Sequence, residues 1–127
     1  MMRSILLVGV VAASISCATA GTTTPGVRRD PNLITEQEVL SSNGANAYEV
    51  ISRARPGFLK SRGHTSVTLP TSDFATVYVN GQQYGDIGTL RSITVDQIRE
   101  IRYYSASEAV NKFVGQMGTG VIQITTK

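Results

Sequence analysis

The sequence predicts an α+β domain, in which short helices accompany a small mixed β-sheet. Runs of β-branched residues, notably Val121–Thr126 near the C-terminal end, are typical of strands. Hydroxyl or amide residues followed three positions later by Glu or Gln mark the starts of short helices. Strands and short helices interspersed along one chain favour the α+β class. Apolar residues make up 41% of the 127 residues and charged residues 17%, which is ordinary for a globular domain and unlike a disordered one.

The first sixteen residues have the layout of a secretory signal peptide. Arg3 supplies a charged start, and residues 5–13 form an almost unbroken apolar run. This run is too short to span a bilayer, which needs about 20 apolar residues. We therefore expect residues 1–16 to be a leader that directs the chain to the cell envelope.

Two cleavage sites follow the apolar run. Ser14-Ile15-Ser16-Cys17 resembles a bacterial lipobox, in which the cysteine is acylated and holds the protein to a membrane. Ala18-Thr19-Ala20 offers an A-x-A cut that would release a soluble protein. Cys17 is the only cysteine, so no internal disulfide can form. We expect lipidation at Cys17, and soluble secretion stays open as the alternative.

Residues 17–32 are expected to form a flexible linker, because they have too little apolar surface to pack. The domain is expected at residues 33–127. It begins with the capping box Thr35-Glu36-Gln37-Glu38. The helix that follows should end by Ser42-Asn43-Gly44, with the glycine in the left-handed conformation.

A second helix is expected from the cap Asn46 to Pro56-Gly57. Its apolar residues recur at helical spacing, which predicts one buried face. Residues 65–73 predict at most an edge strand, since Pro70 interrupts it. The apolar residues of the second helix are Ala47, Val50, Ile51 and Ala54.

A hairpin and a final helix are expected in the C-terminal half. Residues 75–79 form a β-branched and aromatic run that ends in Asn80-Gly81, the strongest two-residue hairpin signal. Residues 82–84 should return antiparallel, followed by a loop at 85–88. Thr94 and Gln97 predict another capped short helix, and residues 101–104 predict a strand. Ser105 and Glu108 predict a third capping box, and the buried stripe of its helix should be Ala106, Ala109, Val110 and Phe113.

This order of elements resembles the plug domain of TonB-dependent outer-membrane receptors over about residues 33–127. The likeness rests on the strand ending in Asn80-Gly81, the helix from Ser105, and a glycine-rich bend leading into Val121–Thr126. The resemblance implies that Phe58-Leu59 begins a strand. In those receptors a barrel follows the plug, whereas this sequence stops at Lys127. We therefore expect a free-standing plug-like domain. No segment of the sequence matches a TonB box, so the sequence does not indicate coupling to TonB.

Catalytic, metal and nucleic-acid sites are not indicated by the sequence. His64 is the only histidine, and the nine carboxylates are spread singly, so neither a nucleophile–His pair nor a metal ligand set is expected. The glycines at 115–120 precede a strand, whereas a phosphate-binding loop precedes a helix. Basic residues alternate with apolar ones and form no dense stripe. We expect no enzyme activity and no cofactor.

The candidate binding residues are polar and aromatic. Tyrosine combines a large contact area with a polar tip and is favoured at binding surfaces. The sequence therefore suggests a non-enzymatic binding or interaction module at the periplasmic side of the outer membrane. Its expected partner is an outer-membrane β-barrel or another envelope protein; the alternatives are a soluble periplasmic ligand-binding protein and a fragment of a receptor gene. The candidate ligand- or partner-binding residues are Gln82, Gln83, Tyr84, Asp86, Tyr103 and Tyr104.

Overall fold

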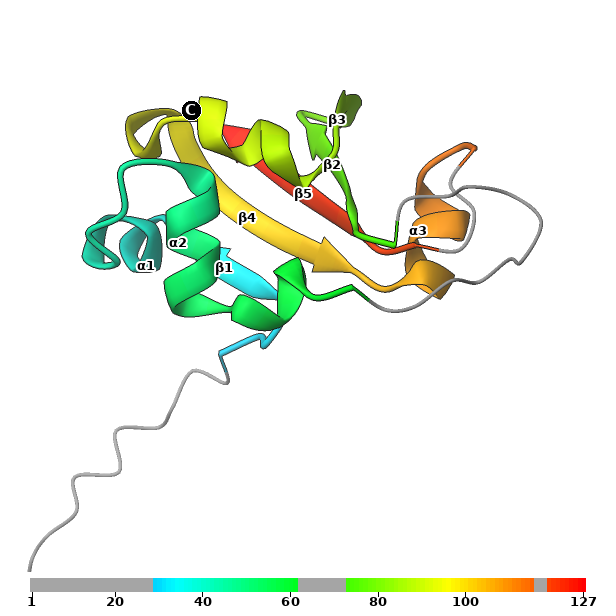
Figure 1. The fold of residues 1–127 in the computed structure, drawn as a ribbon, viewed down its shortest axis with the longest axis horizontal. Helices are drawn as coiled ribbons and strands as arrows, with labels where there is room; N and C mark the ends of the chain where they lie inside the picture. Colours follow the sequence, from blue (N-terminus) through cyan, green and yellow to red (C-terminus); the bar gives the residue numbers. More distant parts are fainter. Residues whose placement is uncertain (1–28, 62–72, 116–118) are drawn as a thin grey trace, which may run out of the picture.

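The computed structural model describes residues 29–61, 73–115 and 119–127. The expected leader, Cys17, His64 and nearly all of the expected edge strand at 65–73 lie outside these residues. The described strands form one five-stranded sheet in the order β1-β4-β5-β2-β3 (Figure 1). They are β1 (Leu33–Thr35), β2 (Thr76–Val79), β3 (Gln82–Gly85), β4 (Ile98–Tyr104) and β5 (Val121–Thr126).

The sheet is mixed, which confirms the α+β prediction. β4 pairs antiparallel with both β1 and β5, and β2 pairs antiparallel with β3. β5 and β2 run parallel, with Val77 opposite Ile122 and Val79 opposite Ile124. The final strand of the chain is therefore the middle strand of the sheet.

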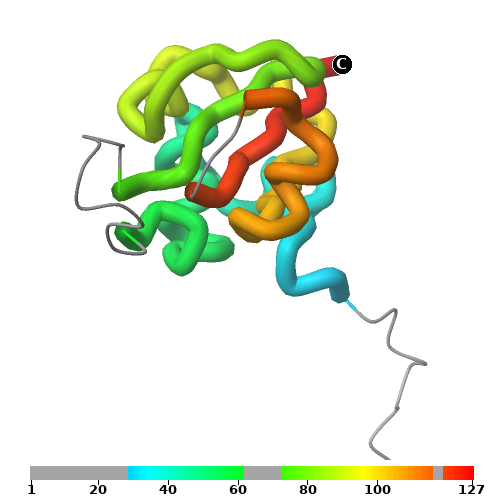
Figure 2. Tube along the Cα trace, turned by 90° about the vertical axis from the view of Figure 1, so that its right-hand side faces the viewer, coloured from blue at the N-terminus to red at the C-terminus, as the bar shows by residue number. Residues whose placement is uncertain are grey.

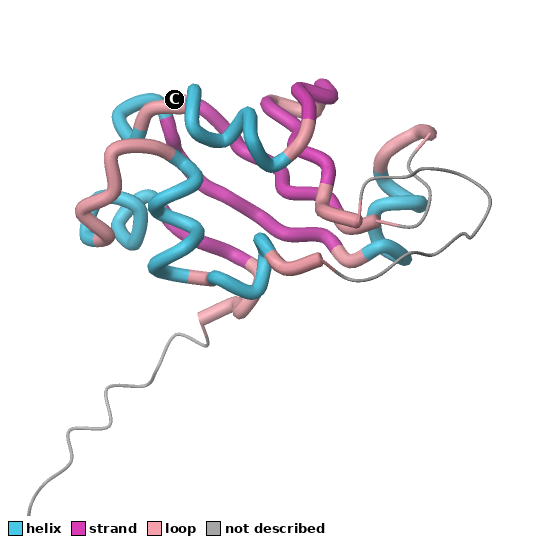
Figure 3. The backbone as a smooth tube through the Cα atoms, viewed as in Figure 1, coloured by secondary structure: helices cyan, strands magenta, loops and turns pink. Residues whose placement is uncertain are grey.

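Among the described residues, three α-helices and three 3-10 helices connect the strands (Figure 3). The cap of α1 is confirmed, since Glu38 N donates to Thr35 Oγ1 and Thr35 N donates to Glu38 Oε2. The cap of α2 is confirmed too, because Glu49 N donates to Asn46 Oδ1 at 3.1 Å. The helices are α1 (Glu36–Ser41), α2 (Ala47–Ala54), η1 (Pro56–Leu59), η2 (Ile87–Ser92), η3 (Val95–Gln97) and α3 (Ala106–Lys112).

The helices cover the two faces of the sheet unequally. α1, α2, η1 and η2 all contribute to one large core, whereas α3 is the only described helix that packs on the opposite face. Figure 1 shows α3 at the far end of the sheet from α1, and Figure 2 shows it on the other side of β5 from α2. The large core contains fully buried residues from four of the strands, namely Ile34, Val77, Ile98, Ile101, Ile122 and Ile124.

The hairpin turn is confirmed as the sequence predicted it. Asn80 and Gly81 have φ values of 50° and 84°, as a two-residue turn of this kind requires. The Asn80 side chain also fastens β5. Its Nδ2 donates to Thr126 Oγ1 at 2.8 Å, and its Oδ1 accepts from Thr126 N at 3.0 Å.

Several local expectations are wrong. The left-handed residue after α1 is Asn43 (φ 52°), not Gly44, since a short polar side chain tolerates this conformation. Phe58 lies in the 3-10 helix η1 and not in a strand, with its ring buried in the large core. A loop is expected at residues 85–88, but residues 87–92 form the 3-10 helix η2, whose Leu90 is fully buried.

The C-terminal half needs two further corrections. Thr94 makes no side-chain cap, and the segment after it is the 3-10 helix η3. β4 starts at Ile98, three residues earlier than predicted. Val110 is 56% exposed, so the buried stripe of α3 reduces to Ala109 and Phe113 because the helix packs on only one strip of the sheet.

Candidate functional site

Three of the predicted binding residues lie together on β3, which is an edge strand. Gln82, Gln83 and Tyr84 are consecutive and exposed, and the side chain of Tyr84 is 52% exposed. β3 pairs with β2 on one side only. A register shift between Val77 and Tyr78 leaves Tyr84 as an extra residue in β3. These three residues form an uncharged, solvent-facing edge.

Asp86 lies next to this edge but has a structural role. Its Oδ1 accepts from Gly88 N at 2.9 Å, which caps η2. Its carbonyl oxygen accepts from Thr89 Oγ1 at 2.6 Å. The carboxylate is therefore bonded to the turn that follows β3, where a cap is worth about 1 kcal/mol.

Tyr103 and Tyr104 lie on opposite faces of the sheet, as neighbouring residues of a strand must. The Tyr103 side chain is only 4% exposed and stacks on Phe58, with ring centroids 5.0 Å apart. Its assignment to a binding surface is wrong, because it belongs to the large core. Tyr104 is partly exposed, packs edge-on against Phe113, and accepts a hydrogen bond from Lys112 Nζ at 2.7 Å.

Beyond α3, the face that carries Tyr104 is polar. The strand registers place Leu33, Arg102, Gln123, Tyr78 and Gln83 in one row across all five strands. In this row Tyr78 is covered by Phe113, and the other four are partly or fully exposed. We call the polar residues of this surface the polar sheet face: Thr35, Gln83, Glu100, Arg102, Gln123 and Thr125.

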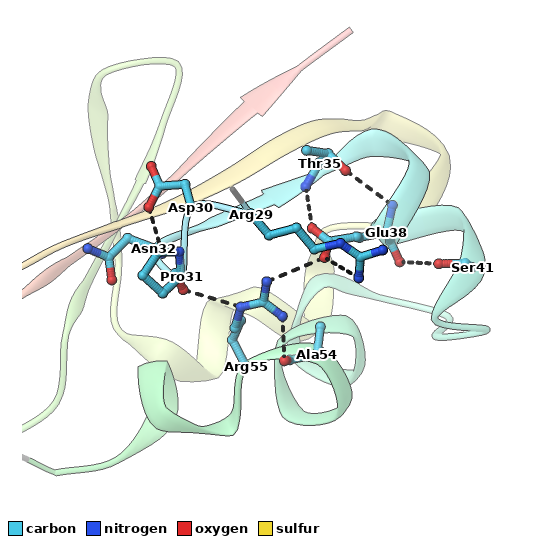
Figure 4. Close-up of polar contacts among 9 residues, drawn as sticks. All are labelled: Arg29, Asp30, Pro31, Asn32, Thr35, Glu38, Ser41, Ala54 and Arg55. Atoms are coloured by element: carbon cyan, nitrogen blue, oxygen red, sulfur yellow. Dashed lines mark hydrogen bonds and ion pairs between the residues drawn. The ribbon is translucent and has the colours of Figure 1, made fainter. Parts of the chain in front are cut away.

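A groove of about 540 Å³ lies beside β1, between α1 and the segment that leads into the strand. Glu38 is its central charged group (Figure 4). The carboxylate accepts from Arg55 Nη2 at 3.3 Å and from Thr35 N at 3.1 Å, and Arg29 Nη1 lies 4.0 Å away. Arg55 Nε also donates to the carbonyl oxygen of Pro31 at 3.2 Å.

Asp30 anchors the same segment from the other side. Its Oδ2 lies 3.2 Å from Arg102 Nη1, and its Oδ1 accepts from Asn32 N at 2.9 Å. Residues 29–32, which the sequence placed in the linker, thus contact the domain. The capping box was visible in the sequence, but nothing in it indicated that the same Glu38 pairs with an arginine 17 positions away. Both carboxylates that line the groove, Asp30 and Glu38, are thus ion-paired with arginines.

The pKa of Glu108 is lowered from its usual value. The cause is hydrogen bonding to the charged carboxylate, first from the Ser105 hydroxyl at 2.7 Å and then from Ser105 N at 2.8 Å. Both bonds belong to the N-terminal cap of α3. The shift therefore reflects a helix cap and not a reactive acid.

Within residues 29–61, 73–115 and 119–127, no three His, Cys, Asp or Glu side chains are grouped as metal ligands. No helix among the described residues is both long and apolar enough to cross a membrane. Searches of protein-family models, curated proteins and solved structures found no match to the chain.

Proposed function

We propose that this chain is a non-enzymatic, plug-like interaction module of the bacterial outer membrane, held to the periplasmic leaflet by lipid on Cys17. Its partner is an outer-membrane β-barrel of TonB-dependent type or another envelope protein. The polar sheet face is the observation that carries the proposal. Helices bury one side of the sheet, whereas Arg102, Gln123 and Thr125 are partly exposed on the other.

The composition of this face suits a polar contact. Arg102 and Glu100 carry opposite charges, and the amide of Gln123 and the hydroxyl of Thr125 lie opposite them on β5. Interfaces that form and dissociate are about as polar as the rest of a protein surface, and arginine is enriched in them. The order of the strand and turn motifs, which resembles receptor plugs, supports the choice of a barrel as partner.

Site-specific photo-crosslinking tests this proposal in intact envelopes. A photoreactive residue replaces Thr125 on the polar sheet face or, as the control, Ser52 on the exposed side of α2. We expect one envelope protein to crosslink at position 125 and not at position 52. Equal crosslinking at both positions, or none at position 125, would contradict the proposal.

The groove beside β1 favours a second candidate, a soluble periplasmic ligand-binding protein. Its volume of about 540 Å³ is in the range of small-molecule sites, which are about 300–1,000 Å³. The mass of the mature N-terminus separates the two candidates. An acylated Cys17 supports the anchored module, whereas a free Gly21 supports the soluble protein.

A further inference from the structure

The two edges of the sheet differ in whether their outward backbone groups are already bonded. On β1, Tyr103 N donates to the carbonyl oxygen of Asn32 at 2.8 Å. In an antiparallel pair, the backbone N–H and C=O groups of successive residues point alternately toward and away from the neighbouring strand. Those of Leu33 and Thr35 therefore point away from β4. Both outward donors have partners within the chain, namely the Asp30 carbonyl oxygen at 3.0 Å and the Glu38 carboxylate at 3.1 Å. The β1 edge is therefore blocked.

The β3 edge is open at Gln83. Thr76 N donates to the carbonyl oxygen of Gly120, the residue directly before β5, at 3.0 Å, and Asn80 N donates to the Ile124 carbonyl oxygen of β5 at 2.9 Å. The backbone N–H and C=O groups of Tyr78, which lies midway between Thr76 and Asn80, also point toward β5. Gln83 lies opposite Tyr78, so its N–H and C=O point away from β2. In the described part of the chain, neither group has a hydrogen bond beyond the sheet.

β3 has only some of the features that usually protect an edge strand. Natural edges are short or bulged, carry charged residues or proline, or are covered by other elements. β3 is four residues long and has a bulge at Tyr84, but it contains no charge and no proline, and its first three residues are exposed. We propose that β3 pairs antiparallel with β3 of a second copy of this chain, about a twofold axis at Gln83.

This register is self-complementary. Each Gln83 donates its N–H to the carbonyl oxygen of the partner's Gln83, and Gln82 lies opposite the partner's Tyr84. The two Asp86 residues lie six positions apart along the ladder, about 20 Å, so no like charges face each other. Arg3, Arg28 and Arg62 lie outside the described residues and account for the formal net charge of +3, so the described residues carry no net charge.

The blocked β1 edge limits the assembly to two copies. A sheet that is open at both edges would grow head to tail into a filament, whereas one open edge per chain gives a closed twofold dimer. Two four-residue strands bury much less than the ~1,200 Å² of a stable interface. We therefore expect a reversible dimer, populated at roughly 0.1–1 mM. The inference is independent of the proposed function, because it needs neither a membrane nor an envelope protein.

Sedimentation and amide hydrogen exchange of the full chain, from 10 μM to 1 mM, test the dimer. As the protein concentration rises, we expect the average mass to approach that of two chains and amide exchange at Gln83 to slow. Exchange at Leu33 and Thr35, whose donors are bonded within the chain, should not depend on concentration. A monomer at 1 mM would overturn the proposal. Protection of Gln83 that does not change with concentration would also overturn it, since a segment of the same chain would then occupy the edge.

A charge swap at position 83 tests the register. Gln83→Lys and Gln83→Glu each place like charges opposite one another, whereas their 1:1 mixture pairs opposite charges. We expect the mixture to associate roughly tenfold more tightly than either variant alone. The control is Gln82→Lys and Gln82→Glu, which face the partner's Tyr84 and should gain nothing on mixing. Equal association of the position-83 variants alone and mixed would place the contact elsewhere and refute this interface.

Discussion

Gly120 occupies a position where even a methyl group cannot fit. A Cβ built there would overlap the Tyr103 hydroxyl oxygen and would lie 2.6 Å from Tyr103 Cζ and 2.8 Å from the Tyr104 carbonyl oxygen. The Tyr103 ring is buried against Phe58, and the Tyr104 carbonyl belongs to the strand that pairs with β5. Neither neighbour can move freely.

We therefore expect Gly120→Ala to destabilise the fold by about 3 kcal/mol, at the upper end of the cost of overpacking. This is a large part of the 5–15 kcal/mol that stabilises a typical domain. Urea denaturation of the two proteins measures the difference in the free energy of unfolding. An equal dependence of this free energy on urea concentration in both proteins checks that unfolding is two-state.

Two variants make this reasoning refutable. A methyl group added at Gly57 would have no neighbour within 4 Å, and Gly57 has no positive φ, so Gly57→Ala should be neutral or slightly stabilising. In a Tyr103→Phe background, which lacks the hydroxyl, Gly120→Ala should cost about 1 kcal/mol less than in the parent, because one of the clashes is gone. If Gly120→Ala behaved like Gly57→Ala, steric contact with Tyr103 would not be the reason for the glycine.

Substitutions at three other positions have defined outcomes. Asn80→Asp removes the amide donor to Thr126 and should cost about 1 kcal/mol in urea denaturation; an unchanged midpoint would show that the clamp on β5 contributes nothing. Glu38→Ala removes a cap and the partner of two arginines, and should cost about 1–2 kcal/mol, whereas Glu38→Gln should cost less. Because the pKa of Glu108 is lowered on folding, its contribution to stability is present above the unfolded pKa and is lost as pH falls through the folded one. Glu108→Gln should therefore flatten the acid side of the stability profile, and an identical profile would contradict the assignment.

The parts of the fold that follow local rules could be predicted from the sequence. The capping residues Thr35 and Asn46 mark helix starts because their side chains bond amides three positions away. Asn80-Gly81 marks the hairpin because both residues must adopt positive φ. Each signal acts over a few residues, so no knowledge of the rest of the chain was needed.

The missed elements depend on contacts between distant residues. η1 and η2 are too short to show helical periodicity, and their buried residues Phe58 and Leu90 become recognisable only against the sheet. Tyr103 and Tyr104 are adjacent in the sequence, so their side chains lie on opposite faces of β4. Which of the two rings faces the large core depends on how β4 is placed in the sheet, between β1 and β5. The same limit applies to the edge at Gln83, since strand order determines which strand has no neighbour.

The strand order gives β5 a role that its place at the end of the sequence does not suggest. β1 and β4 form one antiparallel pair and β2 and β3 another, and β5 is the strand that joins them. A two-stranded unit is marginally stable in water, so neither pair is expected to persist before β5 is inserted. Ile122 and Ile124 are fully buried and contribute to the same core as α1 and α2. We therefore expect the sheet to form as one cooperative unit, in which β5 joins the two strand pairs.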